Sequence, residues 1–225
     1  MPREWPADVQ FLGKDILRVH ATIWPIMLLH LGFPLPKLLF THGHILSGGR
    51  KMSKTIGNTI SADLMIEKFG VDGTRYLLMS AGTFGEDVDL TMERMTEKYN
   101  ADLANGLGNL LSRVIKLSEQ LEKLPFWTKI TKDFYPSLIE EYKFSEALER
   151  IWHEVRNANK YIDDHKPWEL VTGNKDEFIK VMDYLFLKIS GIAYKLKPFM
   201  PGTSEKIEKA LRERKTTSLF ERIKA

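Results

Sequence analysis

Residues 49–58 read GRKMSKTIGN, and this run says more about fold and chemistry than any other part of the chain. Lys51 and Lys54 stand three residues apart in a glycine-flanked loop, with hydroxyl side chains at Ser53 and Thr55. Ammonium groups bind phosphate as strong point charges. A loop of this kind can stabilise the charge that develops on a leaving pyrophosphate. A solvated basic loop is the alternative, and it would be favoured if only the two lysines were present.

The sequence around this loop predicts a mixed α/β fold for residues 1–90. Short apolar runs alternate there with loops marked by glycine and proline. Pro25 is expected to kink or break the first helix, and Ser61 is expected to cap the second. Alternating strands and helices favour a parallel sheet. The expected elements are a strand at 9–13, a helix at 14–31, a strand at 37–46, and helices at 61–69 and 72–81.

Residues 91–225 predict an all-helical part, and a domain boundary is expected near 89–91. Apolar residues recur there at helical spacing, which is typical of a buried helix face. The members of this stripe in the first helix are Leu103, Leu107, Leu110, Leu111, Val114 and Leu117. Four antiparallel helices would form a bundle. They are expected at about 91–123, 136–163, 176–196 and from Pro201 onward.

Composition excludes several classes of protein. The 225 residues include no cysteine, which excludes disulfides and thiolate zinc sites within them. The net charge of +3 is a mild bias and by itself identifies no partner. The longest run without a charged residue, 19–36, contains three prolines, so it is a poor membrane span. No targeting segment is visible in MPREWPADVQ, and a soluble cytoplasmic protein without membrane contact is expected.

Four stretches resemble a known family. GRKMSKTIGN resembles the KMSKS loop of class I aminoacyl-tRNA synthetases, with Thr55 where that consensus has serine. Upstream, WPADVQFLGKDILRVHATIWPIML (5–28) resembles the methionyl-tRNA synthetases closely. NADLANGLGNLLSR (100–113) and ANKYIDDHKPWELV (158–171) resemble anticodon-binding segments of the same family. The resemblance therefore extends over nearly the whole chain.

The resemblance implies a functional role for ten residues of this sequence. They are Lys51, Ser53 and Lys54 in catalysis; Gly13 and Asp15, with Lys54, at the adenosine and phosphates of ATP; His20 and Trp24 at methionine; and Asn109, Arg113 and Trp168 at the anticodon. Val19 departs from the aromatic residue of other members, which changes one wall of the methionine pocket. Structural alternatives exist: Asp15 as a helix cap, His20, Trp24 and Trp168 as core residues, and Asn109 and Arg113 as ordinary surface residues.

The resemblance also implies domains, cofactors and partners. Residues 1–90 would be the C-terminal part of a Rossmann-type catalytic domain, and 91–225 an α-helical anticodon-binding domain. The activity would be that of a methionine–tRNA ligase, with methionine, tRNA(Met) and ATP with Mg²⁺ as substrates and no metal site in this chain. A His-x-Gly-His motif, which class I synthetases need, is absent from the 225 residues; the HGH at 42–44 is no substitute. The chain is therefore expected to need an N-terminal half.

Two other functions stay open at this stage. One is a nonenzymatic module that binds a tRNA anticodon. A coding sequence or partner chain with His-x-Gly-His would exclude it. The other is a class I synthetase for another amino acid, because leucine, isoleucine, valine and cysteine enzymes carry the same loop. The amino acid that supports pyrophosphate exchange would decide between them.

Overall fold

The computed structural model describes residues 5–83, 85–123, 125, 135–215 and 218–224. The chain divides into two compact units. The first, termed the α/β unit, comprises residues up to Thr59 together with Ala81–Thr91. The second, the helical unit, comprises Ile60–Ser80 and the chain from Met92 onward. The predicted single boundary near residue 90 therefore differs from the structure, because residues 60–80 group with the helices that follow.

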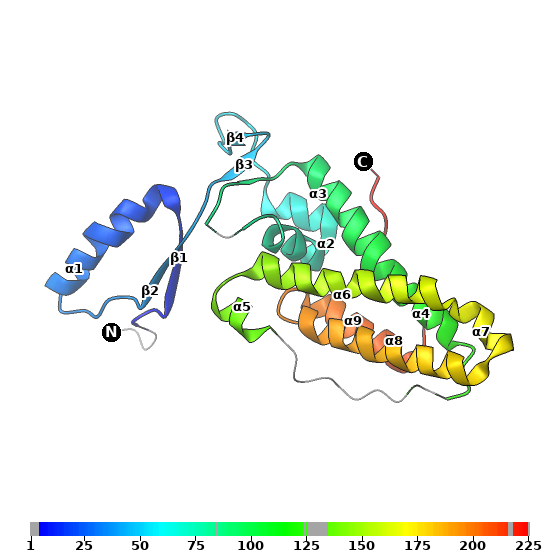
Figure 1. Cartoon of the computed structure of the whole chain (residues 1–225). Helices are drawn as coiled ribbons and strands as arrows, with labels where there is room; N and C mark the ends of the chain where they lie inside the picture. Colours follow the sequence, from blue (N-terminus) through cyan, green and yellow to red (C-terminus); the bar gives the residue numbers. More distant parts are fainter. Residues whose placement is uncertain (1–4, 84, 124, 126–134, 216–217, 225) are drawn as a thin grey trace. The chain divides into compact units, whose positions relative to one another are not determined.

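The α/β unit contains two small sheets (Figure 1). Strand β1 (Val9–Gly13) pairs in parallel with β2 (Leu38–His42), which confirms the expected parallel pairing for these strands. In the second sheet β3 (Ile45–Ser47) lies between β4 (Arg50–Lys51), which is antiparallel to it, and β5 (Val88–Asp89), which is parallel.

The strand region expected at 37–46 is confirmed in part: it divides into two strands, because the chain leaves the first sheet after β2 and joins the second at β3. Gly43 lies between them. An added Cβ at Gly43 would stand 2.0 Å from the backbone oxygen of Glu86, so only glycine allows this close approach.

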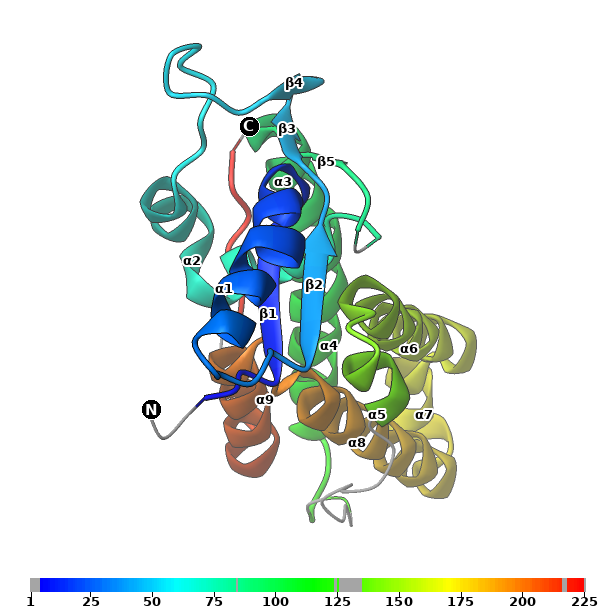
Figure 2. The ribbon, with the colours of Figure 1, turned by 90° about the vertical axis from the view of Figure 1, so that its left-hand side faces the viewer.

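The helical segment between β1 and β2 lies over one face of that strand pair (Figure 2). It comprises a 3₁₀ turn η1 (Lys14–Ile16), a π-helical turn η2 (Val19–Ile23) and α1 (Trp24–His30). Of the kink or break expected at Pro25, the break is wrong, since Ile23 and Trp24 before it have helical dihedral angles and α1 continues beyond it; the segment changes from π-helical to α-helical at Trp24. Pro25 stands in the first turn of α1, where its missing N–H is tolerated.

The described part of the helical unit is built from helices, as expected, and α4, α6, α8 and α9 pack against one another. Its core is apolar, with side chains such as Leu110, Ile151 and Leu185 fully buried. Among the described residues, no helix combines the length and the apolar character needed to cross a membrane. The helices are α2 (Ala62–Met79), α3 (Met92–Lys98), the π-helical η3 (Tyr99–Gly108), α4 (Asn109–Ser118), α5 (Pro136–Glu140), α6 (Phe144–His165), α7 (Pro167–Gly173), α8 (Lys175–Leu196) and α9 (Pro201–Glu213).

Helix α2 belongs to the helical unit because of the contacts that its second half makes. The Tyr76 ring stacks on Trp152 with 4.2 Å between centroids, and its hydroxyl donates to Asp102 Oδ2 at 2.6 Å. Burial, with the Asp102 carboxylate, raises the pKa of Tyr76, so the phenol stays a donor. Arg75 Nε donates to the Phe199 carbonyl at 2.6 Å. Because of this buried aromatic pair and these hydrogen bonds, α2 packs in the helical unit, although it follows the lysine loop directly in sequence.

Helix boundaries differ from expectation at three places. The helix expected at 136–163 ends early and restarts as α6, because Tyr142 takes a positive φ of 59°. The Lys143 N–H closes this helix end on the Leu138 carbonyl at 2.7 Å. Residues 167–173, which lie between the helices expected at 136–163 and 176–196, form the short helix α7. The two helices expected between 61 and 81 are confirmed in part: they meet at Gly70, which has non-helical angles.

Replacing Ser61 with Ala should lower the free energy of unfolding of the helical unit by about 1 kcal/mol. Ser61 Oγ accepts the Leu64 N–H at 3.1 Å, as expected for the N-cap of α2, and Ala leaves that donor without a partner. Urea unfolding followed by circular dichroism measures the loss. Ser61→Asp should restore stability, and Ser112→Ala, at an exposed site inside α4, should not lower it. Equal losses in Ser61→Ala and Ser112→Ala would contradict the capping role.

Candidate functional site

The lysine run begins on a tight hairpin. Strands β3 and β4 are joined by Gly48 and Gly49, which have positive φ values of 63° and 73°. Two positive φ angles are what the type I′ form of a two-residue hairpin turn requires, and glycine adopts them without strain. The Gly49 N–H donates to Asp89 Oδ2 at 3.1 Å, which ties the turn to β5. Lys51 therefore lies on strand β4, where the sequence predicted a loop.

Hydrogen bonds to Asn58 close the rest of the lysine run into a loop. Its Oδ1 accepts the Ser53 N–H at 2.8 Å, and its Nδ2 donates to the Lys51 carbonyl at 3.4 Å. Ser53 Oγ accepts the Thr55 N–H at 3.3 Å, so the serine hydroxyl also helps to shape the loop. Lys54 stands at the exposed tip and makes no ion pair with the described residues. Its ammonium group is therefore available to an anionic ligand.

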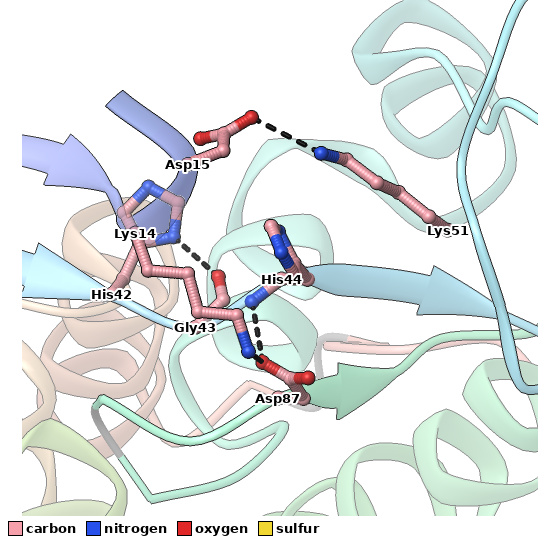
Figure 3. Close-up of polar contacts among 7 residues, drawn as sticks. All are labelled: Lys14, Asp15, His42, Gly43, His44, Lys51 and Asp87. Carbon is pink, nitrogen blue, oxygen red and sulfur yellow. Dashed lines mark hydrogen bonds and ion pairs between the residues drawn. The ribbon is translucent and has the colours of Figure 1, made fainter. Parts of the chain in front are cut away.

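Asp15 and Lys51 meet across the α/β unit. Lys51 Nζ lies 3.1 Å from Asp15 Oδ2, and both side chains are about half exposed (Figure 3). The hydrogen bond and the charge of Lys51 lower the pKa of Asp15, so the carboxylate is ionised at neutral pH. The structure thus brings together one lysine of the loop and the carboxylate that follows β1.

Gly13 leaves room for this carboxylate. A Cβ at Gly13 would stand 2.8 Å from Asp15 Oδ1 and 3.6 Å from the His42 ring. Asp15 lies in the 3₁₀ turn directly after β1 and is exposed. The end of β1 thus presents a carboxylate beside a bare stretch of backbone, which is an arrangement that can receive a polar ligand.

His20 and Trp24 lie one turn apart where η2 passes into α1. Both side chains are partly buried, and His20 Nδ1 lies 3.0 Å from the Ile16 carbonyl. Trp24 packs edge to face on Trp5 with 6.2 Å between ring centroids. The Trp24 indole nitrogen is buried and has no hydrogen-bond partner among the described residues. Its N–H is a donor that is left over by the packing of this unit.

In the helical unit, Arg113 and Trp168 line one groove of about 490 Å³ on α4 and α7. Trp168 is 48% exposed, although it stands in the first turn of α7 beside the buried Pro167. Arg113 donates to Asp163 Oδ1 at 2.5 Å. An exposed indole beside a guanidinium group is suited to stack on and bond an unpaired base. The other residues of this groove are Lys116, Leu117, Gln120, Val171 and Thr172.

Asn109 stands one turn before Arg113 and lines a different hollow. That hollow has a volume of about 540 Å³ and is lined by α4, η3 and the C-terminal segment. Asn109 is exposed at the start of α4. The three residues expected at the anticodon thus lie on one side of α4 or beside it, but only two of them share a groove.

Two polar side chains of the α/β unit that shape the site were not predicted from the sequence. Asn58, at the end of GRKMSKTIGN, could have been noticed as an amide that often fixes loops. Asp87 accepts hydrogen bonds from the Lys14 ammonium and the His44 N–H, and no local pattern marked it. Among the described residues, no group of three or more His, Asp or Glu side chains could hold a metal ion.

Comparison with known proteins gives consistent matches. Residues 4–115 match the family model described as "tRNA synthetases class I (M)". The chain is 37% identical over 219 residues to the methionine–tRNA ligase of Thermotoga maritima, covering 90% of this chain and 35% of that protein. It is 39% identical over 240 residues to the ligase of Caldanaerobacter subterraneus, covering 98% of this chain and 37% of the relative. The chain thus spans about a third of the length of these curated relatives.

Solved structures with a similar fold are also methionyl-tRNA synthetases. The methionyl-tRNA synthetase of Mycobacterium tuberculosis in complex with methionyl-adenylate superposes with a TM-score of 0.79 at 31% identity. That match covers 92% of this chain and 44% of the other. The apo form of the same enzyme gives a TM-score of 0.80 at 26% identity, covering 99% and 51%.

Proposed function

The chain belongs to the methionyl-tRNA synthetase family, and we propose that it supplies the lysine loop and the RNA-binding helices of a methionine–tRNA ligase. The observation that carries this proposal is the pairing of Lys51 with Asp15 at 3.1 Å. It joins a phosphate-binding loop to a carboxylate suited to ribose hydroxyls. Under this proposal, the α/β unit is the C-terminal part of a Rossmann-type catalytic domain.

The proposed first reaction joins methionine to ATP. A carboxylate oxygen of methionine attacks the α-phosphorus, the bond from that phosphorus to the bridging oxygen breaks, and pyrophosphate leaves. Lys51 and Lys54 stabilise the negative charge that grows on the β- and γ-phosphates, with Ser53 shaping their loop. No general base is required, since the attacking carboxylate is already ionised. Mg²⁺ would enter with the phosphates of ATP as part of the substrate.

Asp15 is proposed to accept hydrogen bonds from the ribose hydroxyls beside Gly13. Its pairing with Lys51 would then be exchanged, on nucleotide binding, for contacts of the carboxylate with ribose and of the ammonium with phosphate. An exposed ion pair contributes little free energy, so this exchange costs little. The same pair keeps the two groups close before the nucleotide arrives.

His20 and Trp24 are proposed to contact methionine. A thioether sulfur beside an aromatic ring is a favourable contact. The partly buried indole and imidazole offer such a surface, and the indole N–H without a partner among the described residues can serve a polar atom. Val19, 46% exposed on the same turn, leaves space where an aromatic residue is expected.

The rest of the ligase is proposed to cover the apolar side of η2 and α1. Several large apolar side chains are exposed close together there, whereas single exposed apolar residues are normal on a protein surface. A catalytic domain contributed by the remaining two thirds of the relatives' length would bury them. The residues with at least half of their surface exposed are Ile23, Ile26, Met27, Leu29 and Leu31.

In the second reaction, the activated methionine would pass to the terminal ribose of tRNA(Met), held by its anticodon on the helical unit. Arg113 and Trp168 would receive one unstacked base in their shared groove, with Asn109 bonding a neighbouring base. Stacking on an aromatic ring and hydrogen bonds to base edges are the usual ways in which single-stranded RNA is recognised. Charging would then depend on the anticodon, while adenylate formation would not.

Trp168→Ala should reduce charging of tRNA(Met) by about tenfold, since stacking on one base is worth about 1–3 kcal/mol. The assay uses a complemented enzyme, meaning this chain together with the rest of a methionine–tRNA ligase, such as that of Thermotoga maritima. Trp168→Phe keeps a stacking ring and should retain most of the activity. Arg113→Ala and Asn109→Ala should also weaken charging. All four variants should keep the wild-type rate of pyrophosphate exchange. Equal charging of tRNAs with a cognate and an altered anticodon would contradict this role.

A further inference from the structure

Asp87 connects two segments of the α/β unit that lie far apart in sequence. One oxygen, Oδ1, accepts a hydrogen bond from the His44 backbone N–H at 2.8 Å and also pairs with Lys14 Nζ (Figure 3). Asp87 stands directly before β5, Lys14 opens η1 after β1, and His44 stands directly before β3. A single carboxylate oxygen thus joins the end of β1 to the start of the β3–β4 hairpin.

The two segments carry Asp15 and Lys51, two of the groups that the proposed function places on ATP. Lys14 is the immediate neighbour of Asp15, which is proposed to hold the ribose. His44 leads into β3, and Leu46 of that strand lies opposite Lys51 in the register. Any shift of the hairpin relative to η1 would therefore change the distance between Asp15 and Lys51, which is 3.1 Å in this structure.

The backbone at Gly43, directly before His44, is packed closely against the backbone of Glu86 and Asp87. Gly43 approaches the backbone of Glu86 and Asp87 so closely that a Cβ would stand 2.0 Å and 2.6 Å from their nearest atoms. At the other end of the hairpin, Asp89 accepts the Gly49 N–H. The segment around β5 thus holds the hairpin at both ends, and Asp87 is the end that also reaches Lys14.

The ion pair between Lys14 and Asp87 is exposed, so it adds little to the stability of the fold. The side chains of Lys14 and Asp87 are 42% and 39% exposed, and ion pairs of this kind contribute little to the free energy of unfolding. The bonds from Lys14 and the His44 N–H lower the pKa of Asp87, so the carboxylate keeps its charge at neutral pH. What the carboxylate fixes is therefore geometry.

We propose that Asp87 is a positioning residue of the nucleotide site, which sets the separation of Asp15 and Lys51 by holding Lys14 and the start of β3 together. The inference rests on the proposed function of Asp15 and Lys51. Asp87 acts through these neighbours and is not proposed to contact the nucleotide. Its loss should weaken ATP binding and leave methionine binding unchanged.

The first experiment measures hydrogen exchange of the His44 amide in the complemented enzyme without substrates. Asp87→Ala removes the acceptor and should raise the exchange rate about tenfold or more. Asp87→Asn keeps a carbonyl oxygen for this N–H and should change the rate less. Glu86→Gln is the matched control, because it removes an equal charge from the adjacent exposed residue and should leave the amide as in wild type. Exchange at the wild-type rate in Asp87→Ala, or an unprotected His44 amide in the wild type, would overturn the proposal.

The second experiment measures ATP-dependent pyrophosphate exchange with the same variants. Asp87→Asn should raise the KM for ATP about tenfold, while the KM for methionine and the concentration of active sites stay unchanged. Lys14→Gln should raise the KM for ATP to a similar extent, and the double variant should be no worse than either single one. A reduced concentration of active sites with an unchanged KM would mean a merely structural role and would overturn the proposal, as would additive effects of the two substitutions.

The failure of this inference is distinguishable from the failure of the proposed function. If Lys54→Ala slows pyrophosphate exchange while Asp87→Asn behaves like Glu86→Gln, the function stands and the positioning role is wrong. If Lys54→Ala also has no effect, the proposed function is wrong, and so is a positioning role in an ATP site.

Discussion

Lys54→Ala is expected to slow formation of methionyl-adenylate in the complemented enzyme by about 2–4 kcal/mol of transition-state free energy, roughly 30- to 900-fold. The reason is the place of Lys54 at the exposed tip of a loop that Asn58 closes, where its ammonium makes no ion pair with the described residues. A positive charge beside the β- and γ-phosphates stabilises the leaving pyrophosphate. Pyrophosphate exchange measures the rate, and equilibrium binding of methionine should be nearly unchanged.

Two variants control for loss of charge and loss of fold. Lys54→Arg keeps the charge but replaces a compact ammonium with a planar group, so it should recover only part of the rate. Lys37→Ala removes a charge from another exposed lysine of the α/β unit and should have no effect. Exchange at the wild-type rate in Lys54→Ala would remove the lysine loop from the mechanism.

Local structure could be predicted from the sequence where its determinants are neighbours in the chain. The lysine run, the glycines that flank it and the N-cap at Ser61 depend on residues within a few positions of one another, and the structure has the expected hydrogen bond at Ser61. Parallel pairing of β1 with β2 followed from the alternation of strand and helix. The roles of Gly13 and Asp15, in contrast, came from resemblance and stay predictions.

Long-range contacts could not be predicted, and they account for what was missed. Asp87 meets Lys14 across 73 positions, and nothing in its own neighbourhood signals that contact. Tyr76 has a helical context like that of its neighbours, yet its stacking on Trp152 assigns α2 to the helical unit. The short helix that carries Trp168 lies between the helices expected at 136–163 and 176–196, and it begins at Pro167 because proline is a favoured first residue of a helix.

The 225 residues on their own are expected to form no methionyl-adenylate and to show unequal protection from hydrogen exchange. Large apolar side chains of the α/β unit are exposed on α1, such as Ile26 at 65% and Leu29 at 63%, and its sheets are small. The helical unit buries a continuous apolar core and should open less often. Amides of β1, η2 and α1 should therefore exchange faster than those of α4, α6 and α8.

Because α2 belongs to the helical unit, the difference in protection should follow the two units and not a division of the sequence at residue 90. Because Tyr76 and Leu77 are buried within the helical unit, amides in the second half of α2 should be protected like those of α8. Adding the rest of the ligase should slow exchange from Gly13 to Trp24 and restore pyrophosphate exchange, while α8 stays as it was. Adenylate formation by the chain alone, or uniform protection of both units, would contradict the proposal that the exposed face of α1 is completed by the rest of the enzyme.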